Sequence, residues 1–490
     1  MVGIQKFGGY IPRLRLSRKA IVDAHAWANP ALKAQAKSER SICNWDEDPV
    51  TMAVEAARDC LGQNSRGDVA ALYFASTSAP FDDRQNAGII AEALNVGGRA
   101  AALDVSGSLR AGTSALIAAA GAVALDHKPA LVVSAEQRRT AAASPLELSS
   151  GDGSAAVLLG PDDGAARLLA QHSAAVDFVD HYRGHGREFD YVWEERWIRD
   201  EGYLKIVPAA VKALLEKAGV APAAIKHFCF PCTLPRVADT IAQRLGIPST
   251  SLRDQLAAGC GDTGSSHALV MLVHALEDAA PGDLILVVGF GQGCDVLLFQ
   301  ATDAIRDHAR PSGISRSLAR GKIESNYQKY LAFNDLVKIE KGMRAEVDRQ
   351  TPLSMLYRKR DMLLGLVGGR CRICGTMQFP KSRICVNPNC NAFHSQDDQS
   401  FADFPARVLS WSADYLTYSP DPPAYYGMVQ FDPGGRLMAD FTDVDRGAVE
   451  VGMDMRMVFR VKERDAQRGF VRYFWKAAPA GAPAVAKSEA

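Results

Sequence analysis

Residues 101–125, AALDVSGSLRAGTSALIAAAGAVAL, constrain the fold of this chain more than any other stretch. A short apolar strand leads through the small-residue turn Ser106-Gly107-Ser108 directly into an Ala-rich helix. A turn of this kind presents one side chain at a helix N-terminus, where free backbone N–H groups and the helix dipole stabilise an anion. The side chain presented here is predicted to be that of Leu109 or one of its neighbours.

The composition indicates a soluble protein of more than one domain. The chain has 490 residues, 47% of them apolar and 23% charged, which predicts two or three domains with cores of their own. Its 56 Lys and Arg residues balance 56 Asp and Glu residues, so no net charge favours nucleic acid or an anionic membrane. The sequence shows neither a signal peptide nor an apolar run long enough to cross a bilayer, and we expect a cytoplasmic protein.

Residues 1–301 alternate apolar strand patterns with helical ones, which is typical of layered α/β folds. Residues 70–76 and 129–134 are predicted strands, and residues 50–61 a helix. The second half repeats the first, because ALVVSAEQ followed by GDGSAAVLLG matches DLILVVGFGQGCDVLLF as strand, turn and strand. We therefore predict a duplicated α/β domain.

The remaining residues fall into four further segments. Residues 302–330 are polar and broken by Pro and Gly, which indicates a linker. Residues 331–400 are predicted to form a helix followed by a Cys-rich module. Five short strand patterns in residues 401–476 predict a small all-β barrel, and residues 477–490 are predicted to be a disordered tail.

Four cysteines form the strongest local motif. Cys371-x-x-Cys374 is followed after ten residues by Cys385-x4-Cys390, which predicts two knuckles that hold one tetrahedral metal ion. Four thiolate ligands leave no open position for water, so we predict a structural zinc, with iron as the alternative.

Several stretches together carry a resemblance to a known family. They are VGIQKFGGY at residues 2–10, the Asp46-Glu47-Asp48-Pro49 run, the turn and helix of residues 104–116, Gly151-Asp152-Gly153, and Gly289-Phe290-Gly291-Gln292-Gly293. In their order and spacing, residues 1–301 resemble the thiolase superfamily, in its branch of 3-hydroxy-3-methylglutaryl-CoA synthase and ketoacyl-carrier-protein synthase III. Residues 325–475 resemble the zinc-ribbon and OB-fold family that accompanies thiolase-like enzymes.

The resemblance implies a duplicated five-layered α/β fold, followed by a rubredoxin-like zinc ribbon and an OB-fold barrel. It implies a homodimer or higher homo-oligomer, an active site between the two halves, and a tunnel for coenzyme A covered by the zinc-ribbon and OB-fold part. Acyl-CoA or a small β-keto compound is the implied substrate, and a separate thiolase is a partner only in the alternative of a non-catalytic chain.

The resemblance also places the family's catalytic residues on this chain. The nucleophilic cysteine falls at Leu109, the histidine at or next to Pro231, the asparagine at Asp262 and the synthase glutamate at Thr77. Leucine has no lone pair, so the covalent acyl-enzyme of the family is not expected at residue 109. The turn and Gly-rich loops, represented by Leu109, Gly291 and Gly293, are still expected to receive a thioester oxygen.

Two carboxylates are candidate catalytic groups. Asp262 is expected to be partly buried, which favours a general base or acid. Glu136 follows a predicted strand and is either a base at the cleft or a surface residue paired with Arg138 or Arg139.

Three further residues are weaker candidates. Cys232 is either an alternative nucleophile or an inert buried thiol. Ser108 is a serine nucleophile or a helix cap, and Arg110 binds a substrate carboxylate or an internal acid. Tyr191, Trp193, Trp197 and Tyr203 either wall an acyl pocket or belong to ordinary packing.

These features predict a CoA-dependent enzyme that makes or breaks a C–C bond next to a carbonyl. Retro-Claisen cleavage of a β-keto acid or β-ketoacyl-CoA, with the CoA thiolate or water as nucleophile, is the first hypothesis. Aldol-type cleavage of an acyl-CoA and a non-catalytic CoA-binding partner of a separate thiolase are the alternatives. Binding of oligonucleotides by the barrel is disfavoured, because residues 401–475 lack a basic, aromatic face.

Overall fold

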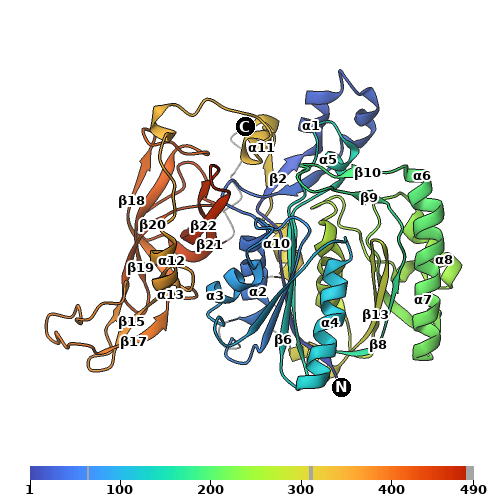
Figure 1. Ribbon diagram of the computed structural model, residues 1–490, viewed down its shortest axis with the longest axis horizontal. Coiled ribbons are helices and arrows are strands. Elements are labelled where there is room, and N and C mark those ends of the chain that lie inside the picture. The colour runs from blue at the N-terminus through green and yellow to red at the C-terminus, as the bar shows by residue number, and fades with distance from the viewer. Residues whose placement is uncertain (63–65, 308–312, 482–490) are drawn as a thin grey trace. The chain divides into compact units, whose positions relative to one another are not determined.

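The computed structural model describes residues 1–62, 66–307 and 313–481 in two units (Figure 1). The first unit consists of Met1–Asn44, Asp48–Gly88 and Gly98–Leu331. The second consists of Trp45–Glu47, Ile89–Gly97 and Ala332–Ala490. Among the described residues, no helix is both long and apolar enough to cross a membrane.

A duplicated strand order organises the first unit. Nine strands are hydrogen-bonded in the order β11-β12-β13-β8-β1-β7-β6-β4-β5, and β1 meets β8 antiparallel at the centre. On one side β7, β6 and β4 follow β1, and on the other side β13, β12 and β11 follow β8 in the same directions. The predicted duplication is therefore confirmed. The bounds are β1 (Gly3–Tyr10), β4 (Ala71–Ala75), β5 (Ala101–Val105), β6 (Ala130–Glu136), β7 (Gly153–Gly160), β8 (Ala166–Ala175), β11 (Ile225–Cys229), β12 (Leu284–Phe290) and β13 (Gly293–Ala301).

Helices form layers on both faces of these strands. The central layer holds α4 (Ala111–Asp126) and α9 (His267–Asp278), whose apolar residues share one core with strands of both halves. Helices α7 (Leu204–Ala218) and α8 (Val237–Leu245) pack in a second core on the outer side of β8 and β13 (Figure 1). Helix α2 (Pro49–Leu61) packs on β1 and β7, and α3 spans Asn86–Ala93. This is the predicted five-layered, thiolase-like arrangement.

The expected linker of residues 302–330 contains regular structure of the first unit in its described parts, 302–307 and 313–330, while residues 308–312 lie outside the described residues. Helix α10 (Gly313–Ala319) begins where the buried Glu277 carboxylate accepts hydrogen bonds from the N–H groups of Ile314 and Ser315. Strand β14 (Lys322–Glu324) adds parallel to β2 (Leu14–Ser17). The accompanying elements are β3 (Glu39–Ile42), α1 (Arg18–His25), α5 (Pro145–Ser149) and α11 (Tyr327–Phe333).

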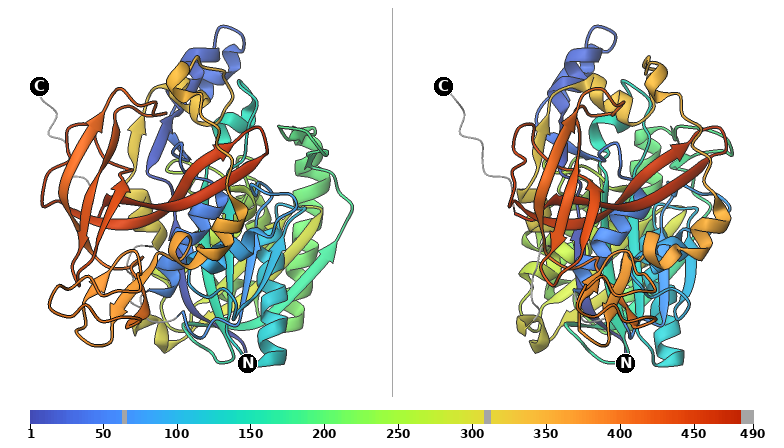
Figure 2. Two further views of the ribbon diagram at one scale, coloured as in Figure 1. Left: turned by 60° about the vertical axis from the view of Figure 1, so that its left-hand side comes forward. Right: turned by 90° about the vertical axis from the view of Figure 1, so that its left-hand side faces the viewer.

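The second unit contains a small three-stranded sheet and a five-stranded barrel. The small sheet has the order β16-β15-β17, and the barrel has the order β20-β19-β18-β21-β22. A bridge between Phe441 and Ala477 joins its ends, and Figure 2 shows the long β21–β22 hairpin in red. All five barrel strands were predicted. The bounds are β15 (Val367–Cys371), β16 (Met377–Gln378), β17 (Gln396–Ser400), β18 (Ala406–Asp414), β19 (Ala424–Phe431), β20 (Arg436–Asp440), β21 (Asp454–Asp465) and β22 (Phe470–Pro479).

Two sequence expectations for this unit were wrong in part. The expected helix before the cysteines is reduced to short turns of α12 (Leu353–Arg358) and α13 (Arg360–Leu363), because Gly342 with φ +69° and Pro352 interrupt the segment. The expected disordered tail begins too early, since residues 477–479 continue β22 and pair with β21. Residues 482–490 of that tail lie outside the described residues.

Buried charges of the second unit are paired with one another. The fully buried Arg460 guanidinium lies 3.1 Å from the Glu47 carboxylate and 3.0 Å from Asp443. The Lys476 ammonium lies 2.8 Å from Asp46. Asp46 and Glu47 of the acidic run are therefore used in the interior of this unit, where they pair with these cations.

Candidate active site

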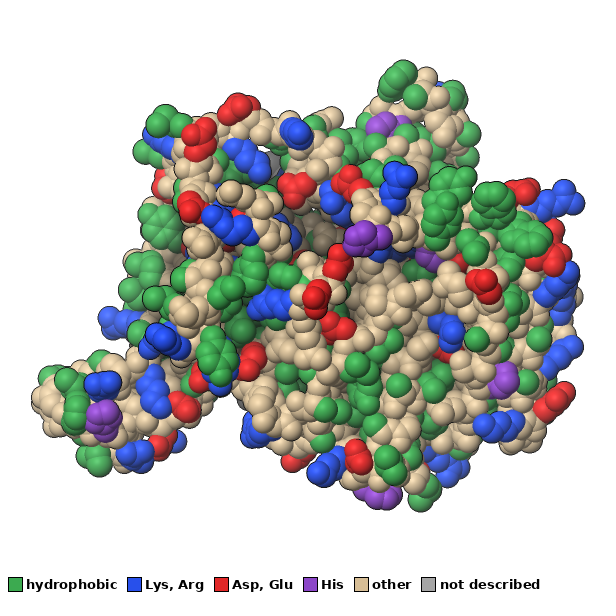
Figure 3. Space-filling view, in the orientation of Figure 1, with side chains coloured by type: hydrophobic (Ala, Val, Ile, Leu, Met, Phe, Trp, Pro, Cys, Tyr) green, Lys and Arg blue, Asp and Glu red, His purple; other side chains and the backbone are tan. Residues whose placement is uncertain are grey.

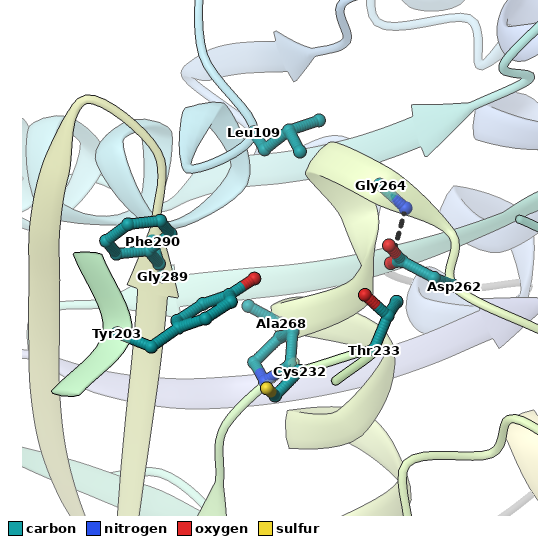
Figure 4. Close-up of a pocket in the computed structure, with 10 residues that line it drawn as sticks. Leu109, Tyr203, Cys232, Thr233, Asp262, Gly264, Ala268, Gly289 and Phe290 are labelled. Atoms are coloured by element: carbon teal, nitrogen blue, oxygen red, sulfur yellow. Dashed lines mark hydrogen bonds between the residues drawn. The ribbon is translucent and has the colours of Figure 1, made fainter. Parts of the chain in front are cut away.

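A pocket in the first unit lies where the N-terminal ends of α4 and α9 meet (Figure 4). It contains about 380 Å³ of empty space, part of it open to solvent. It brings together three positions to which the resemblance assigns family roles, Leu109, Pro231 and Asp262, and the candidate thiol of Cys232. The remaining lining residues are Tyr203, Thr233, Gly264, Ala268, Gly289 and Phe290.

The turn before α4 is held against the loop between β12 and β13. The Ser108 hydroxyl donates to the Gly291 carbonyl at 2.7 Å and accepts from the Arg110 N–H at 3.2 Å. The Arg110 Nε–H donates to the same carbonyl at 3.0 Å. Ser108 is thus engaged in capping the turn, which argues against a serine nucleophile.

Arg110 has an internal partner, the fully buried Asp295 of β13. The Arg110 Nη1 lies 2.6 Å from Asp295 Oδ1, and the hydroxyls of Thr113, Ser114 and Ser173 also donate to this carboxylate. Of the two readings of Arg110 in the sequence, the structure shows the internal ion pair. Asp295 itself was missed, because nothing in its local sequence marks it as the acceptor of four donors.

Leu109 carries a backbone donor on this side that stays available. The Gly291 N–H donates to the Gly293 carbonyl within the loop, so Gly291 does not offer it to a ligand. Within the described chain, the Leu109 N–H makes no hydrogen bond to another residue. The expected oxyanion site is therefore reduced to the Leu109 N–H beside an unreactive side chain.

Tyr203 enters the pocket from a π-helical turn, η2 (Ile198–Tyr203), that precedes α7. Pro208 lies inside α7, where it lacks an N–H and crowds the carbonyl of Leu204, and the wider turn lies directly before this defect. The Tyr203 ring packs against Phe290 at 4.6 Å between centroids. Its hydroxyl points toward the side of the pocket that carries Asp262 (Figure 4).

Burial raises the pKa of Tyr203 well above its usual value of 10, and nearby Asp180 and Asp262 add to the shift. The phenol is therefore protonated at all physiological pH values and is a hydrogen donor. Within the described residues its hydroxyl has no protein hydrogen-bond partner, which leaves the proton available to a ligand.

Asp262 lies opposite Tyr203, on the turn before α9. Its backbone is fixed by hydrogen bonds to Ser149 and Gly151, and its Oδ1 accepts from the Gly264 N–H at 3.0 Å. His267 Nδ1 lies 3.9 Å away but accepts from the Thr263 N–H, while Nε2 lies 3.0 Å from the Gln255 carbonyl. Both ring nitrogens of His267 are thus engaged by Thr263 and Gln255 rather than by Asp262.

Glu136 is fully buried one layer behind the pocket. Its Oε2 accepts from the Thr77 N–H at 3.1 Å, from the Thr77 hydroxyl at 3.0 Å and from the Ser265 hydroxyl, whereas Oε1 has no hydrogen-bond partner. Glu136 is therefore not the surface residue that one reading expected. Its carboxylate instead contacts Thr77, the position that the resemblance assigned to the synthase glutamate.

Arg138, a second buried cation near the pocket, is also neutralised. A Cβ added to Gly264 would lie 2.9 Å from Arg138 Cδ, which places this side chain directly behind the lining. Its guanidinium donates to Asp190, and Arg183 contacts the other oxygen of the same carboxylate at 3.0 Å. Asp190 holds the pKa of Arg138 above its usual value despite burial.

Cys232 is present in the lining but is held as a thiol. Burial raises the pKa of Cys232 to about 12, and its Sγ lies 3.7 Å from the Leu234 carbonyl. A thiolate nucleophile at neutral pH is therefore disfavoured. Of the four aromatic residues singled out in the sequence, Tyr203 alone lines the pocket, whereas Tyr191, Trp193 and Trp197 are exposed.

The four cysteines of the second unit converge as their spacing predicts. Their Sγ atoms all lie within 4.8 Å of one another, with 3.9 Å between Cys371 and Cys390 and 3.5 Å between Cys374 and Cys385. Four sulfurs around a tetrahedral ion at about 2.3 Å would be about 3.8 Å apart. The donor set and its spacing fit a tetrahedral metal ion.

Two family models match parts of the chain. The C-terminal part of 3-oxoacyl-[acyl-carrier-protein] synthase III matches residues 215–297, and the C-terminal OB-fold domain of ChsH2 matches residues 403–460. The first match covers β11, β12 and most of β13 in the second half of the duplicated unit, and the second covers most of the barrel.

Curated relatives and solved structures agree with these matches. A protein named hydroxymethylglutaryl-CoA synthase from Caldivirga maquilingensis is 28% identical to this chain, and the alignment covers 70% of this chain and 99% of the relative. A protein of the same name from Methanobrevibacter smithii is also 28% identical, with 69% of this chain and 100% of the relative covered. A crystal structure of HMG-CoA synthase complexed with CoA has a TM-score of 0.59 at 17% identity, covering 71% of this chain and 94% of that one. The 3-oxoacyl-[acyl-carrier-protein] synthase III of Aquifex aeolicus has a TM-score of 0.54 at 19% identity, covering 61% and 100%.

Proposed function

We propose, from the premise that this chain joins a thiolase-like domain to a ChsH2-type OB-fold domain, that it is a CoA-dependent enzyme that makes or breaks a C–C bond next to a carbonyl. The bond chemistry is acid–base catalysis without a covalent acyl-enzyme. One observation carries this proposal: the Tyr203 phenol and the Asp262 carboxylate line the same pocket as Leu109, whereas the lining offers no thiolate.

The groups that line this pocket favour aldol-type cleavage over retro-Claisen cleavage. Retro-Claisen cleavage requires a nucleophile that attacks a β-keto carbonyl, and in this pocket the CoA thiol or water would have to supply it. Aldol-type cleavage requires only a base, a proton donor and a site for the developing oxyanion. Asp262, Tyr203 and the Leu109 N–H provide these three.

The proposed reaction starts from a 3-hydroxyacyl-CoA. Asp262 takes the proton of the 3-hydroxyl, the bond between C2 and C3 breaks, and C3 leaves as a ketone or aldehyde carbonyl. The electron pair moves to the thioester oxygen as an enolate, to which the Leu109 N–H donates. Tyr203 then delivers a proton to C2, which gives a shortened acyl-CoA, and the proton on Asp262 returns to the phenolate through solvent.

The test uses the purified full-length chain without other proteins. It is incubated with 3-hydroxyacyl-CoA thioesters, and separately with β-ketoacyl-CoA thioesters and CoA, and acyl-CoA products are measured by mass spectrometry. We expect carbonyl release from the hydroxy series, abolished by Asp262→Asn and unaffected by Asp239→Asn, an exposed control on α8. Cleavage of the β-keto series alone would replace the aldol reading by the retro-Claisen one. Complete inactivity that a separate thiolase restores would contradict catalysis by this chain.

We also propose that the cysteine cluster holds one structural zinc ion. The second unit has a short sheet around Cys371 and Cys374 with little apolar core, and metal binding would supply its stability. Elemental analysis should find about one zinc per chain, lost in Cys385→Ser and kept in Cys232→Ser. Iron instead of zinc, or equal zinc in both variants, would contradict the proposal.

A further inference from the structure

We propose that the pocket selects acyl groups that are uncharged at the end remote from the thioester, and that it rejects acyl groups ending in a carboxylate. This inference rests on the proposed function only in taking the pocket to be the acyl site. It concerns the charge of the substrate, which neither the bond chemistry nor the fold determines.

The lining of the pocket contains one charged side chain, and that charge is negative. Asp262 is the acidic residue, and the other lining side chains are apolar or neutral, among them Leu109, Pro231, Ala268 and Phe290. No Lys, Arg or His belongs to this lining. A second carboxylate in this space would meet the first at short range.

The two arginines that lie next to the pocket are both neutralised by buried acids. Arg110 follows Leu109 directly, and its guanidinium is bound by Asp295 at 2.6 Å. Arg138 lies behind Gly264, and its guanidinium is bound by Asp190. Each acid is in addition bound by other donors, Ser114 on Asp295 and Arg183 on Asp190, so neither arginine is free to turn toward a ligand.

The energetics follow from desolvation. An anion that enters a pocket loses hydration, and only an opposite charge or several donors compensate for this loss. Here the available donors are the Tyr203 hydroxyl and the Leu109 N–H, and Asp262 adds repulsion that strengthens at low dielectric. Rejection of a carboxylate by a like charge in the pocket is a recognised route to specificity.

The hydroxymethylglutaryl group, from which the similar archaeal synthases take their name, ends in a carboxylate. The proposal therefore separates this chain from those relatives by the charge of the acyl group. Phe290, Ala268 and Pro231 instead offer an apolar surface to a branched or straight alkyl group.

Binding of two isosteric thioesters tests the proposal without any turnover. In 4-methylpentanoyl-CoA the terminal isopropyl group replaces the terminal carboxylate of succinyl-CoA, and neither compound has a 3-hydroxyl that the proposed reaction could use. Calorimetric titration of the full chain should give a dissociation constant at least about tenfold lower for 4-methylpentanoyl-CoA. Asp262→Asn should shrink this ratio to less than about threefold by improving succinyl-CoA binding, and the exposed control Asp239→Asn should leave the ratio unchanged.

A second variant tests the same point by adding a cation. Leu109→Lys places an ammonium at the pocket, and we expect it to bind succinyl-CoA at least about tenfold more tightly than the unmodified chain does. Equal or tighter binding of succinyl-CoA by the unmodified chain, an unchanged ratio in Asp262→Asn, or no binding of either thioester would overturn the proposal. Selective binding of the neutral thioester without cleavage of any 3-hydroxyacyl-CoA would contradict the proposed reaction and leave the charge selection intact.

Discussion

The two turns that lead into the central helices α4 and α9 occupy corresponding places in the duplicated unit but differ in chemistry. On the α4 side, the hydroxyl of Ser108 and the guanidinium of Arg110 are bound by Gly291 and Asp295. On the α9 side, Asp262 and, across the pocket, Tyr203 expose polar atoms to the ligand space (Figure 4). The polar side chains of the α4 turn are thus bonded internally, whereas those on the α9 side of the pocket retain unused hydrogen-bonding capacity.

This difference shows how a duplicated scaffold can separate structure from chemistry. The helices approach so closely that a Cβ on Gly112 of α4 would lie 2.6 Å from the Ser265 carbonyl, so both turns must keep their backbone paths. Side chains on the α4 turn are then free to serve stability, while those on the α9 turn serve the reaction. On the face visible in Figure 3, basic and acidic side chains are interspersed.

The largest effect is expected from Tyr203→Phe, which removes one oxygen from the reactive side. We expect kcat for cleavage to fall by about 10²- to 10⁴-fold with little change in KM, because a positioned proton donor contributes rate rather than binding. Because the pKa of Tyr203 is raised well above 10, the unmodified enzyme should show no decline in kcat/KM from this group up to pH 9. Tyr191→Phe, an exposed neighbour, is the control. Retention of more than about a tenth of kcat would remove Tyr203 from the mechanism.

Variants of the ion pair beside the α4 turn should lower the free energy of unfolding. Asp295→Asn leaves the Arg110 guanidinium without its counter-charge, and breaking a buried pair in this way costs about 3 kcal/mol or more in the free energy of unfolding. Urea unfolding followed by circular dichroism measures this loss. The double variant Arg110→Met with Asp295→Leu should recover part of it, because no unpaired charge remains. If Asp295→Asn lowers the free energy of unfolding by less than about 1 kcal/mol, the α4 turn depends less on the ion pair than the contacts of Asp295 indicate.

The third prediction concerns the pH dependence of stability that arises from Asp152, a buried carboxylate outside the pocket lining. Its Oδ2 accepts from the Cys43 N–H at 2.7 Å while Oδ1 has no hydrogen-bond partner, and burial raises the pKa of Asp152 to about 6. The folded state therefore holds this proton more tightly than the unfolded state does. Its contribution to stability is present at about pH 4 and is lost as the pH rises through about 6, by up to about 3 kcal/mol.

Asp152→Asn isolates this contribution, because an amide mimics the protonated acid at every pH. The free energy of unfolding, measured in urea from pH 4 to pH 7 for both proteins, should fall more steeply with pH in the unmodified chain. Parallel curves for the two proteins would show that Asp152 has the same proton affinity in both states.

The sequence predicted features that depend on near neighbours. The strand, turn and helix of residues 101–125 follow from composition within one segment, and the four cysteines follow from their spacing. The partner of Arg110 lies 185 residues away on β13, and no local pattern identifies it. For the same reason, the sequence left open whether Arg110 binds substrate or an internal acid.

Tyr203 shows the other limit of prediction from sequence. Four aromatic residues between 191 and 203 looked equivalent in the sequence, and their separation depends on the π-helical turn before Pro208. The helix expected at the start of residues 331–400 does not form as one element, because Gly342 and Pro352 interrupt a segment whose composition otherwise favours a helix. In both cases the path of the backbone determines the structure, and this path cannot be read from the type of a single side chain.

The smallest effect is expected from Leu109→Cys, which restores a thiol at the satisfied turn. The side chain is half-buried at the pocket, so folding should stay nearly intact. We expect no gain of synthase turnover, because Pro231 and Thr77 stand where the resemblance places the histidine and glutamate, and a thiol without a histidine partner stays protonated. Intact-mass measurement after incubation with acetyl-CoA should show no acyl adduct, with Leu109→Ser as the matched control. Stoichiometric acylation with turnover would show that the α4 turn retains a working base, and the contrast between the two turns would then be wrong.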